Sequence, residues 1–262
     1  MSLSVGTALR DGWTTFRRTP WTFVFFVLFA FVLSTVVDLV PGFAGVIVST
    51  LVELWATVGL IRGAWLGLNG QRPSFGDLIK INGPDIWRLF SRQFLLTLLL
   101  GVISTTAAFV AVKAADAGEI AQSIFWRVQG IEPSNFEEIN RLFTEIQSLS
   151  IAILSSPVSV LVLLIAAVIA IYIQVNQLFL GFVAVVRSLG PIATLREGFR
   201  IVQRQWWTVL ALLAMQLLII LVGLIAFGFG LLAAIPVVMC STASAYRQLF
   251  GDDDSTRFLT SR

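Results

Sequence analysis

The carboxylate of Glu53 is the side chain most suited to chemistry, because it stands near the middle of an apolar run, flanked by Ser49, Thr50 and Thr57. If that run crosses a bilayer, a charge at its centre costs about 3 kcal/mol even on forgiving insertion scales. We therefore expect Glu53 to face the interior of a helical bundle, where it can bind a proton or a cation. Alternatively, a protonated Glu53 donates a hydrogen bond to a neighbouring hydroxyl and only joins two helices.

Further polar side chains interrupt the later apolar runs. With Glu53 they make up a candidate intramembrane polar site of Glu53, Gln174, Asn176, Gln177, Gln216 and Tyr246. Polar groups are costly to expose to lipid tails, so we expect them to face other helices. They can line a cavity together, or they can be packing contacts that bind no ligand.

Several kinds of catalytic site are excluded because the sequence has no histidine and a single cysteine, Cys240. Zinc sites of Cys and His, His-ligated haem, and Ser-His-Asp or Cys-His catalytic groups all need residues that are missing. We predict no cofactor, no metal site and no catalytic residue, and we expect a protein that is not an enzyme. Cys240 is most simply a small buried residue.

The composition indicates a membrane protein. Of the 262 residues, 57% are hydrophobic and only 13% are charged, and the mean hydropathy is +0.88. Soluble domains have about 45–50% apolar and about 25% charged residues, so this chain has too little polar surface to coat a soluble globule. Although the net charge is +3, the basic residues flank apolar runs and form no separate domain, so we expect no nucleic acid partner.

The apolar runs predict an all-α, polytopic membrane helical bundle with about six transmembrane helices. A span needs about 20 residues to cross a hydrocarbon core of about 30 Å. We expect a single membrane domain over 1–262, with spans near 21–40, 43–66, 94–112, 158–186, 206–226 and 231–249. The turns Pro41-Gly42 and Gly228 to Gly230 separate the first and last pairs, and Pro236 is expected to kink the sixth span.

The distribution of Lys and Arg predicts the orientation, because cytoplasmic loops carry the excess of basic residues. With both termini in the cytoplasm, the outer side holds only Lys113, Arg127 and Arg141 of the eighteen basic residues. Acidic residues outnumber these three on that side. We therefore expect a multi-pass protein with cytoplasmic N- and C-termini.

The segment from Ala8 to Thr22 matches the segment from Thr194 to Thr208, with six of fifteen aligned positions identical. The apolar residues of both copies recur at helical spacing and the arginines take other faces, which is typical of interfacial amphipathic helices. We predict such helices near 5–18 and 191–204 and a looser one near 74–91. The predicted contacts to anionic lipid headgroups are Arg10, Arg17, Arg18, Arg196, Arg200 and Arg204.

Each amphipathic helix precedes a pair of spans, so the chain can be described as three repeats of an interfacial helix plus a helical hairpin. All three begin on the same side of the membrane, which predicts parallel repeats related by an axis along the membrane normal. The alternative is convergence, since arginine-rich amphipathic helices beside spans acquire similar compositions.

A polar outer-side loop over 113–150 separates the third and fourth spans. Ser134 and Glu137 form a capping-box pattern, and apolar residues follow at helical spacing from Phe136 through Phe143 to Leu149. A shorter helix around Ile120 to Val128 is expected before it. Together these helices can cap the bundle or dock a protein partner, or their apolar face can rest on lipid.

Several short motifs carry a family resemblance. They are Gly59-Leu60-Ile61-Arg62, Gly70-Gln71-Arg72-Pro73-Ser74-Phe75, Gly190-Pro191, Pro236 and Ala245-Tyr246-Arg247. With these motifs the chain resembles the glycerophosphodiester phosphodiesterase membrane-domain group, a superfamily of uncharacterised bacterial six-span proteins. The resemblance implies a six-span fold in a bacterial inner (plasma) membrane and brings no functional residues. We expect no phosphodiesterase activity, because the chain has neither room for the soluble domain nor a cluster of carboxylates and histidines for a metal.

Two functions are predicted from these patterns. A membrane scaffold, assembly or partner-binding protein accounts for the basic interfacial helices and the outer helical pair. A small-solute or lipid-handling transporter that uses Glu53 and the polar residues of the later spans is the alternative. An intramembrane enzyme comes third, since acid and base chemistry would fall to Glu53 and tyrosine alone. A polar path that reaches Glu53 favours transport, and a tightly packed interior favours the scaffold.

Overall fold

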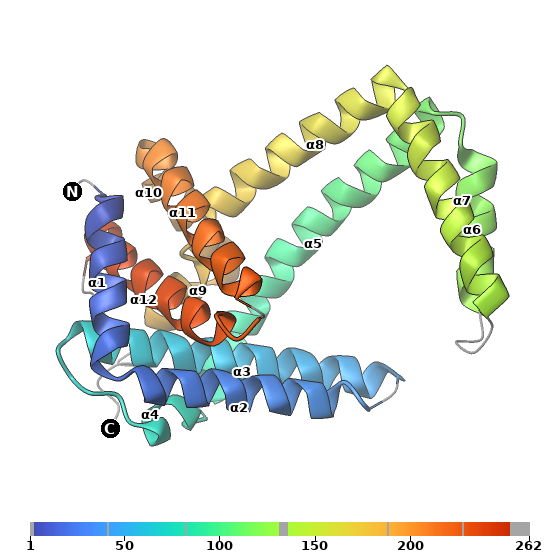
Figure 1. The fold of residues 1–262 in the computed structure, drawn as a ribbon. Coiled ribbons are helices and arrows are strands. Elements are labelled where there is room, and N and C mark those ends of the chain that lie inside the picture. Colours follow the sequence, from blue (N-terminus) through green and yellow to red (C-terminus); the bar gives the residue numbers. More distant parts are fainter. Residues whose placement is uncertain are drawn as a thin grey trace. The chain divides into compact units, whose positions relative to one another are not determined.

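The structure is a computed structural model that describes residues 3–40, 42–81, 83–130, 136–187, 189–226 and 228–251. These residues form the helices α1 to α12 and one short 3-10 turn, and none of them lies in a strand (Figure 1). The predicted all-α fold class is confirmed.

Five helical stretches of the described chain are long and apolar enough to cross a membrane. They are Pro20–Val37, Ala44–Leu68, Gly83–Ala114, Pro157–Val186 and Pro191–Ile225. Only 17–33% of the residues in their most apolar windows are buried, so most of their apolar surface points outward, and lipid is the solvent that suits it. The chain is a multi-pass membrane protein.

The sixth predicted span is not among these five stretches. Helix α12 (Leu231–Phe250) occupies it, but its second half is rich in polar residues, among them Ser241, Ser244 and Arg247. Most of that half is buried, so the helix does not need an apolar surface for lipid.

Within the predicted single membrane domain, packing separates two compact units. Unit 1 comprises residues 1–95 and 174–262, and unit 2 comprises residues 96–173.

Unit 1 begins with α1 (Val5–Arg18), α2 (Pro20–Val37) and α3 (Gly42–Leu68). Helices α2 and α3 pack side by side as a hairpin, and α1 runs across one end of it (Figure 1). Gly42 has a φ of 79° at the hairpin turn, a backbone conformation that glycine adopts at no steric cost. The Ser49 hydroxyl donates a hydrogen bond to Asp38 over 3.0 Å beside this turn.

The looser amphipathic segment predicted near 74–91, with a break at Gly83-Pro84, is divided into two helices. Helix α4 (Phe75–Ile79) is a single turn, and α5 (Gly83–Ala114) begins four residues later and continues through the predicted third span. Pro84 therefore lies in the first turn of a helix, where its missing N–H is not needed. Ser74 and Asp77 form a capping box at α4, and hydrogen bonds from Ser74 lower the pKa of Asp77.

The rest of unit 1 contains the C-terminal helices. The predicted fourth span is divided between α8 (Pro157–Asn176), most of which belongs to unit 2, and α9 (Leu180–Val186). Helix α10 (Pro191–Val202) and the 3-10 turn Gln203–Gln205 lead into α11 (Trp206–Ile225). Gly228, with a φ of 77°, lies in the turn before α12, and Pro236 is inside α12.

An aromatic cluster fills the centre of unit 1. The Tyr246 side chain is fully buried, and its ring lies 4.8 Å from Phe250, 5.5 Å from Phe182 and 5.9 Å from Trp65, measured between centroids. These residues come from α3, α9 and α12, so the cluster joins three helices that are far apart in the sequence.

Unit 2 contains most of α5 and α8 and, between them, α6 (Gly118–Gly130) and α7 (Phe136–Ser155). Two helices thus lie in the segment predicted as an outer-side loop. Ser134 of the predicted capping box lies outside the described residues. The small residues Ala107 and Ala111 are buried on α5, and the Ser159 hydroxyl donates to the Ala111 carbonyl over 2.8 Å. This contact joins the last turns of α5 to the first turn of α8.

Candidate functional site

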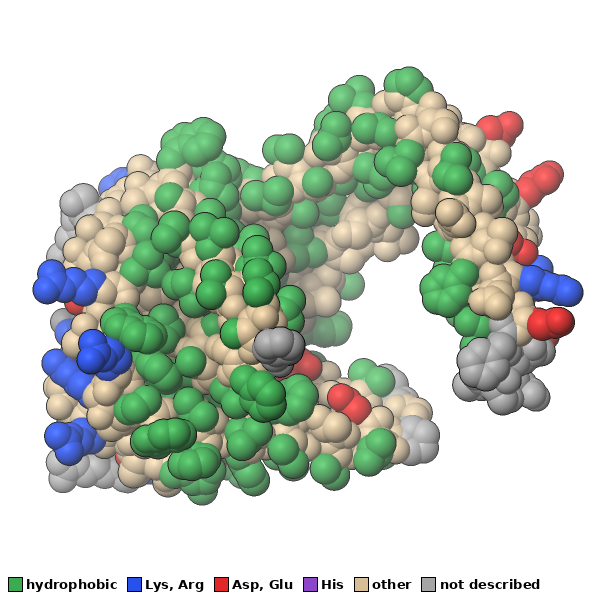
Figure 2. Space-filling model, in the orientation of Figure 1, with side chains coloured by type: hydrophobic (Ala, Val, Ile, Leu, Met, Phe, Trp, Pro, Cys, Tyr) green, Lys and Arg blue, Asp and Glu red, His purple; other side chains and the backbone are tan. Residues whose placement is uncertain are grey.

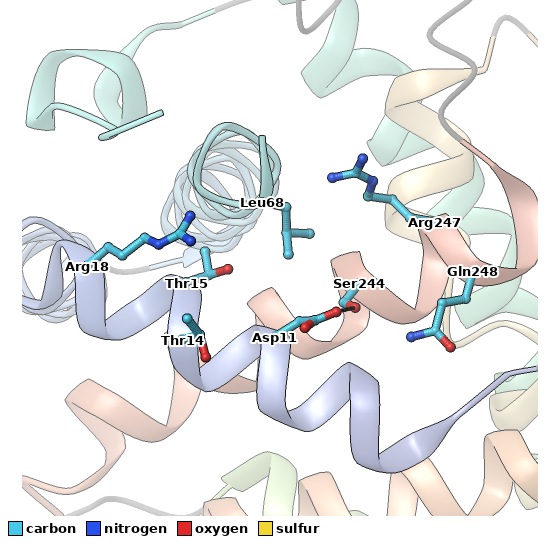
Figure 3. Close-up of a pocket in the computed structure, with 8 residues that line it drawn as sticks. All are labelled: Asp11, Thr14, Thr15, Arg18, Leu68, Ser244, Arg247 and Gln248. Atoms are coloured by element: carbon cyan, nitrogen blue, oxygen red, sulfur yellow. Dashed lines mark hydrogen bonds between the residues drawn. The ribbon is translucent and has the colours of Figure 1, made fainter. Parts of the chain in front are cut away.

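A pocket of about 440 Å³ opens where α1, the end of α3 and the end of α12 meet. Eight residues line it: Asp11, Thr14, Thr15, Arg18, Leu68, Ser244, Arg247 and Gln248 (Figure 3). All but Leu68 are polar or charged, so the pocket is suited to a polar ligand.

Helical spacing brings these side chains to one place. On α1, Asp11, Thr14, Thr15 and Arg18 are separated by three or four residues, so they share one face. Ser244, Arg247 and Gln248 share a face of α12 for the same reason. The side chain of Leu68, the last residue of α3, lies between the two guanidinium groups of Arg18 and Arg247 in the view of Figure 3.

Hydrogen bonds hold the polar groups of the pocket in position. The Ser244 hydroxyl donates to Asp11 over 2.9 Å and joins α12 to α1. Arg18 donates to the Gly67 carbonyl at 3.4 Å. Gln248 accepts a hydrogen bond of 2.8 Å from the backbone N–H of Ser4.

Arg247 is held on two sides. It donates to the Asn69 side chain over 3.1 Å, and its guanidinium carbon lies 5.3 Å from the centre of the Trp65 ring, within the range of a cation–π contact. The aromatic cluster of unit 1 therefore positions one of the two arginines of the pocket.

The charged groups in the lining of the pocket are mainly basic. The lining contains two guanidinium groups and one carboxylate, Asp11, which already accepts a hydrogen bond from Ser244. Arginine side chains bind phosphate and carboxylate groups through paired N–H donors. The charge of the lining therefore favours an anionic ligand such as a phosphate group.

A second pocket, of about 400 Å³, lies beside α10 and the end of α12. Its lining is Arg200, Ile201, Arg204, Gln205 and Leu249. Arg204 aligns with Arg18 in the sequence match of the two segments, and Gln205 accepts a 2.6 Å hydrogen bond from the backbone N–H of Leu3. Each matched segment thus contributes its equivalent arginine to a pocket.

The six arginines predicted to contact lipid headgroups divide into two groups. Arg18, Arg200 and Arg204 line the two pockets. Arg10, Arg17 and Arg196 are exposed and line neither of them. In unit 1, the Lys and Arg side chains visible in Figure 2 gather at one end, which we call the basic face.

The structure does not bring the candidate intramembrane residues together. Glu53 is exposed on α3, so the expectation that it faces the interior is wrong. Its backbone carbonyl accepts a hydrogen bond from the Thr57 hydroxyl over 2.9 Å. Hydropathy predicts how deep a residue lies along a helix, but the face it takes depends on which neighbours pack there.

The other candidate residues lie in separate contacts. Gln216 is buried and donates to Ser241 and Thr242 over 3.1 and 2.9 Å, which joins α11 to α12. Asn176 and Gln177 are buried, and Gln177 donates to the Leu195 carbonyl of α10 over 3.2 Å. Gln174 is exposed, and Tyr246 belongs to the aromatic cluster. These contacts favour helix packing over a shared cavity.

The sequence did not single out Asp11, Arg247 or Gln248 as site residues. A signal was present in each helix, namely polar residues at a spacing of three and four. It could not show that the first and last described helices pack together, which is what creates the pocket.

Comparisons with protein-family models, with curated proteins and with solved structures found no match for this chain. The resemblance to the glycerophosphodiester phosphodiesterase membrane-domain group therefore stays a prediction.

Proposed function

We propose that this multi-pass membrane protein is a scaffold whose basic face binds the headgroups of anionic phospholipids. The observation that carries the proposal is the 440 Å³ pocket whose lining includes both Arg18 of α1 and Arg247 of α12 (Figure 3). A phosphate group there accepts hydrogen bonds from both guanidinium groups. The bound headgroup then joins the two ends of the described chain at the membrane surface.

The packed centre of unit 1 supports a scaffold over a transporter. The aromatic cluster around Tyr246 joins α3, α9 and α12, and Gln216 is used to hold α11 against α12. A transporter that uses Glu53 needs a polar path between this residue and the polar residues of the later helices. The contacts of those residues instead satisfy them within helix packing.

The helices α1, α4 and α10, which begin the three predicted repeats, support a repeated architecture. Helix α1 packs on α12, α4 packs on α3 and α10 packs on α9. In the three-repeat description, α4 and α10 therefore each pack on the last helix of the preceding repeat, and α1 packs on the last helix of the third repeat. This cyclic order fits parallel repeats related by an axis along the membrane normal.

The basic face and both termini are proposed to be cytoplasmic. Trp21, Trp87 and Trp207 are each more than 65% exposed near the starts of α2, α5 and α11, close to arginines in the sequence, as expected at a membrane interface. The test is a thiol probe on a Ser4→Cys variant that also carries Cys240→Ala. We expect labelling only after cells are permeabilised. Labelling of intact cells would contradict the orientation.

Headgroup binding is tested with the full-length protein in detergent, by native mass spectrometry with added phosphatidylglycerol. The pocket variant Arg18→Gln/Arg247→Gln is compared with Arg10→Gln/Arg17→Gln, which removes the same charge from exposed positions outside the pocket. We expect the pocket variant to retain at least about tenfold less phosphatidylglycerol, because two charge-assisted contacts are worth about 1.5 kcal/mol or more. The control should lose much less.

Two results would argue against the proposal. Equal loss of phosphatidylglycerol from both double variants would mean that only the general positive charge matters. Equal retention of phosphatidylcholine and phosphatidylglycerol by the unmodified protein would mean that the pocket does not select anionic lipid.

A further inference from the structure

Helices α6 and α7 pack through a polar contact. Arg127 of α6 forms a salt bridge of 2.8 Å with Glu145 of α7, and the Ser123 hydroxyl donates to the same carboxylate over 3.2 Å. In a hairpin surrounded by water, apolar side chains normally face each other and charges face outward. The charged pair between these helices is therefore unusual.

Large apolar side chains of the same hairpin point outward. The exposed fractions are 58% for Phe125 on α6, and 66% for Phe143 and 70% for Leu154 on α7. Val128 and Ile146 are exposed as well. By helical spacing, Phe125 and Val128 share a face of α6, and Phe143, Ile146 and Leu154 share a face of α7.

These two stripes lie on one side of the hairpin. On each helix the stripe is displaced by a similar angle, in the same rotational sense, from the face that carries Arg127 or Glu145. In an antiparallel pair, equal displacements from the contact face lead to the same side. We call this side the apolar face; it comprises Phe125, Val128, Phe143, Ile146 and Leu154. Arg141 lies on the opposite side of α7.

Short connections hold the α6–α7 hairpin next to the end of α5 and the start of α8. Residues 115–117 join α5 to α6, and Ser156 alone lies between α7 and α8. The Ser156 hydroxyl donates to the Ala114 carbonyl over 3.1 Å. Within unit 2, α6 and α7 turn sharply away from the direction of α5 and α8 (Figure 1). If α5 and α8 cross the membrane, the hairpin runs along its surface.

Lipid is also the solvent of the helices next to the hairpin. Phe109 on α5 and Leu161 on α8 are 60% and 57% exposed, and both belong to stretches apolar enough to cross a membrane. The apolar face continues this exposed apolar surface beyond the ends of the two helices.

We infer that the α6–α7 hairpin lies on the membrane surface where α5 ends and α8 begins, with its apolar face inserted into the bilayer between the headgroups and the acyl chains. Amphipathic helices bind lipid in this way when one face is apolar and the other charged. The ligand is the phospholipid bilayer itself, and Phe125 and Phe143 are the central contacts.

The test uses the full-length protein in phospholipid vesicles, with Cys240→Ala as background and one fluorescent label. The label is attached at position 143 through Phe143→Cys, or at position 141 through Arg141→Cys as the matched control on the other side of α7. We expect the label at 143 to emit at a shorter wavelength, and shallow spin-labelled lipids to quench it at least threefold more strongly than the label at 141. Circular dichroism and gel filtration select variants that keep the helical fold.

Three outcomes would overturn the inference. Water-like emission at both positions would mean that the face is exposed to solvent. A protected label at 143 that lipid does not quench, with emission that depends on protein density in the vesicle, would indicate a second copy of the chain. Protection without lipid quenching at every density would indicate burial against the rest of the same chain.

Discussion

Helices α1 and α10 carry matched sequences and dock through the same positions. Ala8, Gly12 and Phe16 are buried on α1, and their aligned partners Thr194, Gly198 and Val202 are buried on α10. The acidic residue that precedes each glycine contacts a neighbouring segment: Asp11 accepts from Ser244, and Glu197 pairs with Arg187. The sequence match between the two segments therefore includes the residues through which each helix packs on its neighbour, in addition to the arginines predicted to contact lipid.

The two docking contacts differ in closeness. A Cβ added at Gly12 would lie 2.6 Å from the backbone nitrogen of Ser241. A Cβ added at Gly198 would lie 3.0 Å from the Asn176 carbonyl oxygen and 3.1 Å from the Gln177 side chain. Helix α1 is thus packed against the backbone of α12 without free space, whereas α10 has a small tolerance.

The largest predicted effect comes from a substitution that disrupts the close contact between α1 and α12. We expect Gly12→Ala to lower the free energy of unfolding by about 2 to 3 kcal/mol, because the overpacked Cβ must push α1 away from α12. Gly198→Ala should cost about 1 kcal/mol or less, since a shift of a few tenths of an ångström relieves the contact. The measurement is unfolding of the purified protein by SDS in mixed micelles.

Gly6→Ala is the control for these variants. Gly6 is also in α1, but a Cβ there would meet nothing within 4 Å. Alanine favours helix over glycine by up to about 1 kcal/mol, so this variant should be neutral or slightly stabilising. Equal destabilisation by Gly12→Ala and Gly198→Ala would show that the two contacts are equally close.

The apolar runs predict most helices of the fold because a run of about 20 apolar residues has few alternatives to a membrane helix. The helices α2 and α11 lie within two or three residues of the predicted spans 21–40 and 206–226. The sequence also indicates the interruption near Gly83-Pro84, since α4 ends at Ile79 and α5 begins at Gly83. It does not indicate that the segment after Gly83 is continuous with the third predicted span in one long helix.

The direction in which a side chain faces is much harder to predict from the sequence. Gln216 and Glu53 both interrupt apolar runs, yet Gln216 is buried against Ser241 and Thr242 whereas Glu53 is exposed. The difference depends on α12, which packs on α11 beside Gln216. No local pattern around either residue contains that information.

The candidate pocket is harder still to predict from the sequence, because Arg18 and Arg247 are separated by most of the chain. Sequence patterns predict Arg18 as a headgroup contact from its place on a basic amphipathic helix. Arg247 joins it only because the small residues Ala8 and Gly12 let α1 approach α12 closely. The site therefore depends on the same docking contact that distinguishes α1 from α10.

A smaller difference between α1 and α10 is predicted for their acidic residues, Asp11 and Glu197. Glu197→Gln should lower the free energy of unfolding by about 1 to 2 kcal/mol, because it removes the carboxylate that faces Arg187 across 3.1 Å in a half-buried pair. Asp11→Asn should change it by less than about 0.5 kcal/mol, since the amide oxygen still accepts a hydrogen bond from Ser244. SDS unfolding measures both variants.

Arg200→Gln separates the half-buried ion pair of Glu197 from its exposed one. Arg200 also contacts Glu197, over 2.8 Å, but its side chain is 69% exposed, and exposed pairs contribute little because water and salt screen them. This variant should therefore be nearly as stable as the unmodified protein. If Asp11→Asn proves as damaging as Glu197→Gln, the carboxylate charge matters equally in both helices, and the distinction between a neutral contact on α1 and an ionic contact on α10 would be wrong.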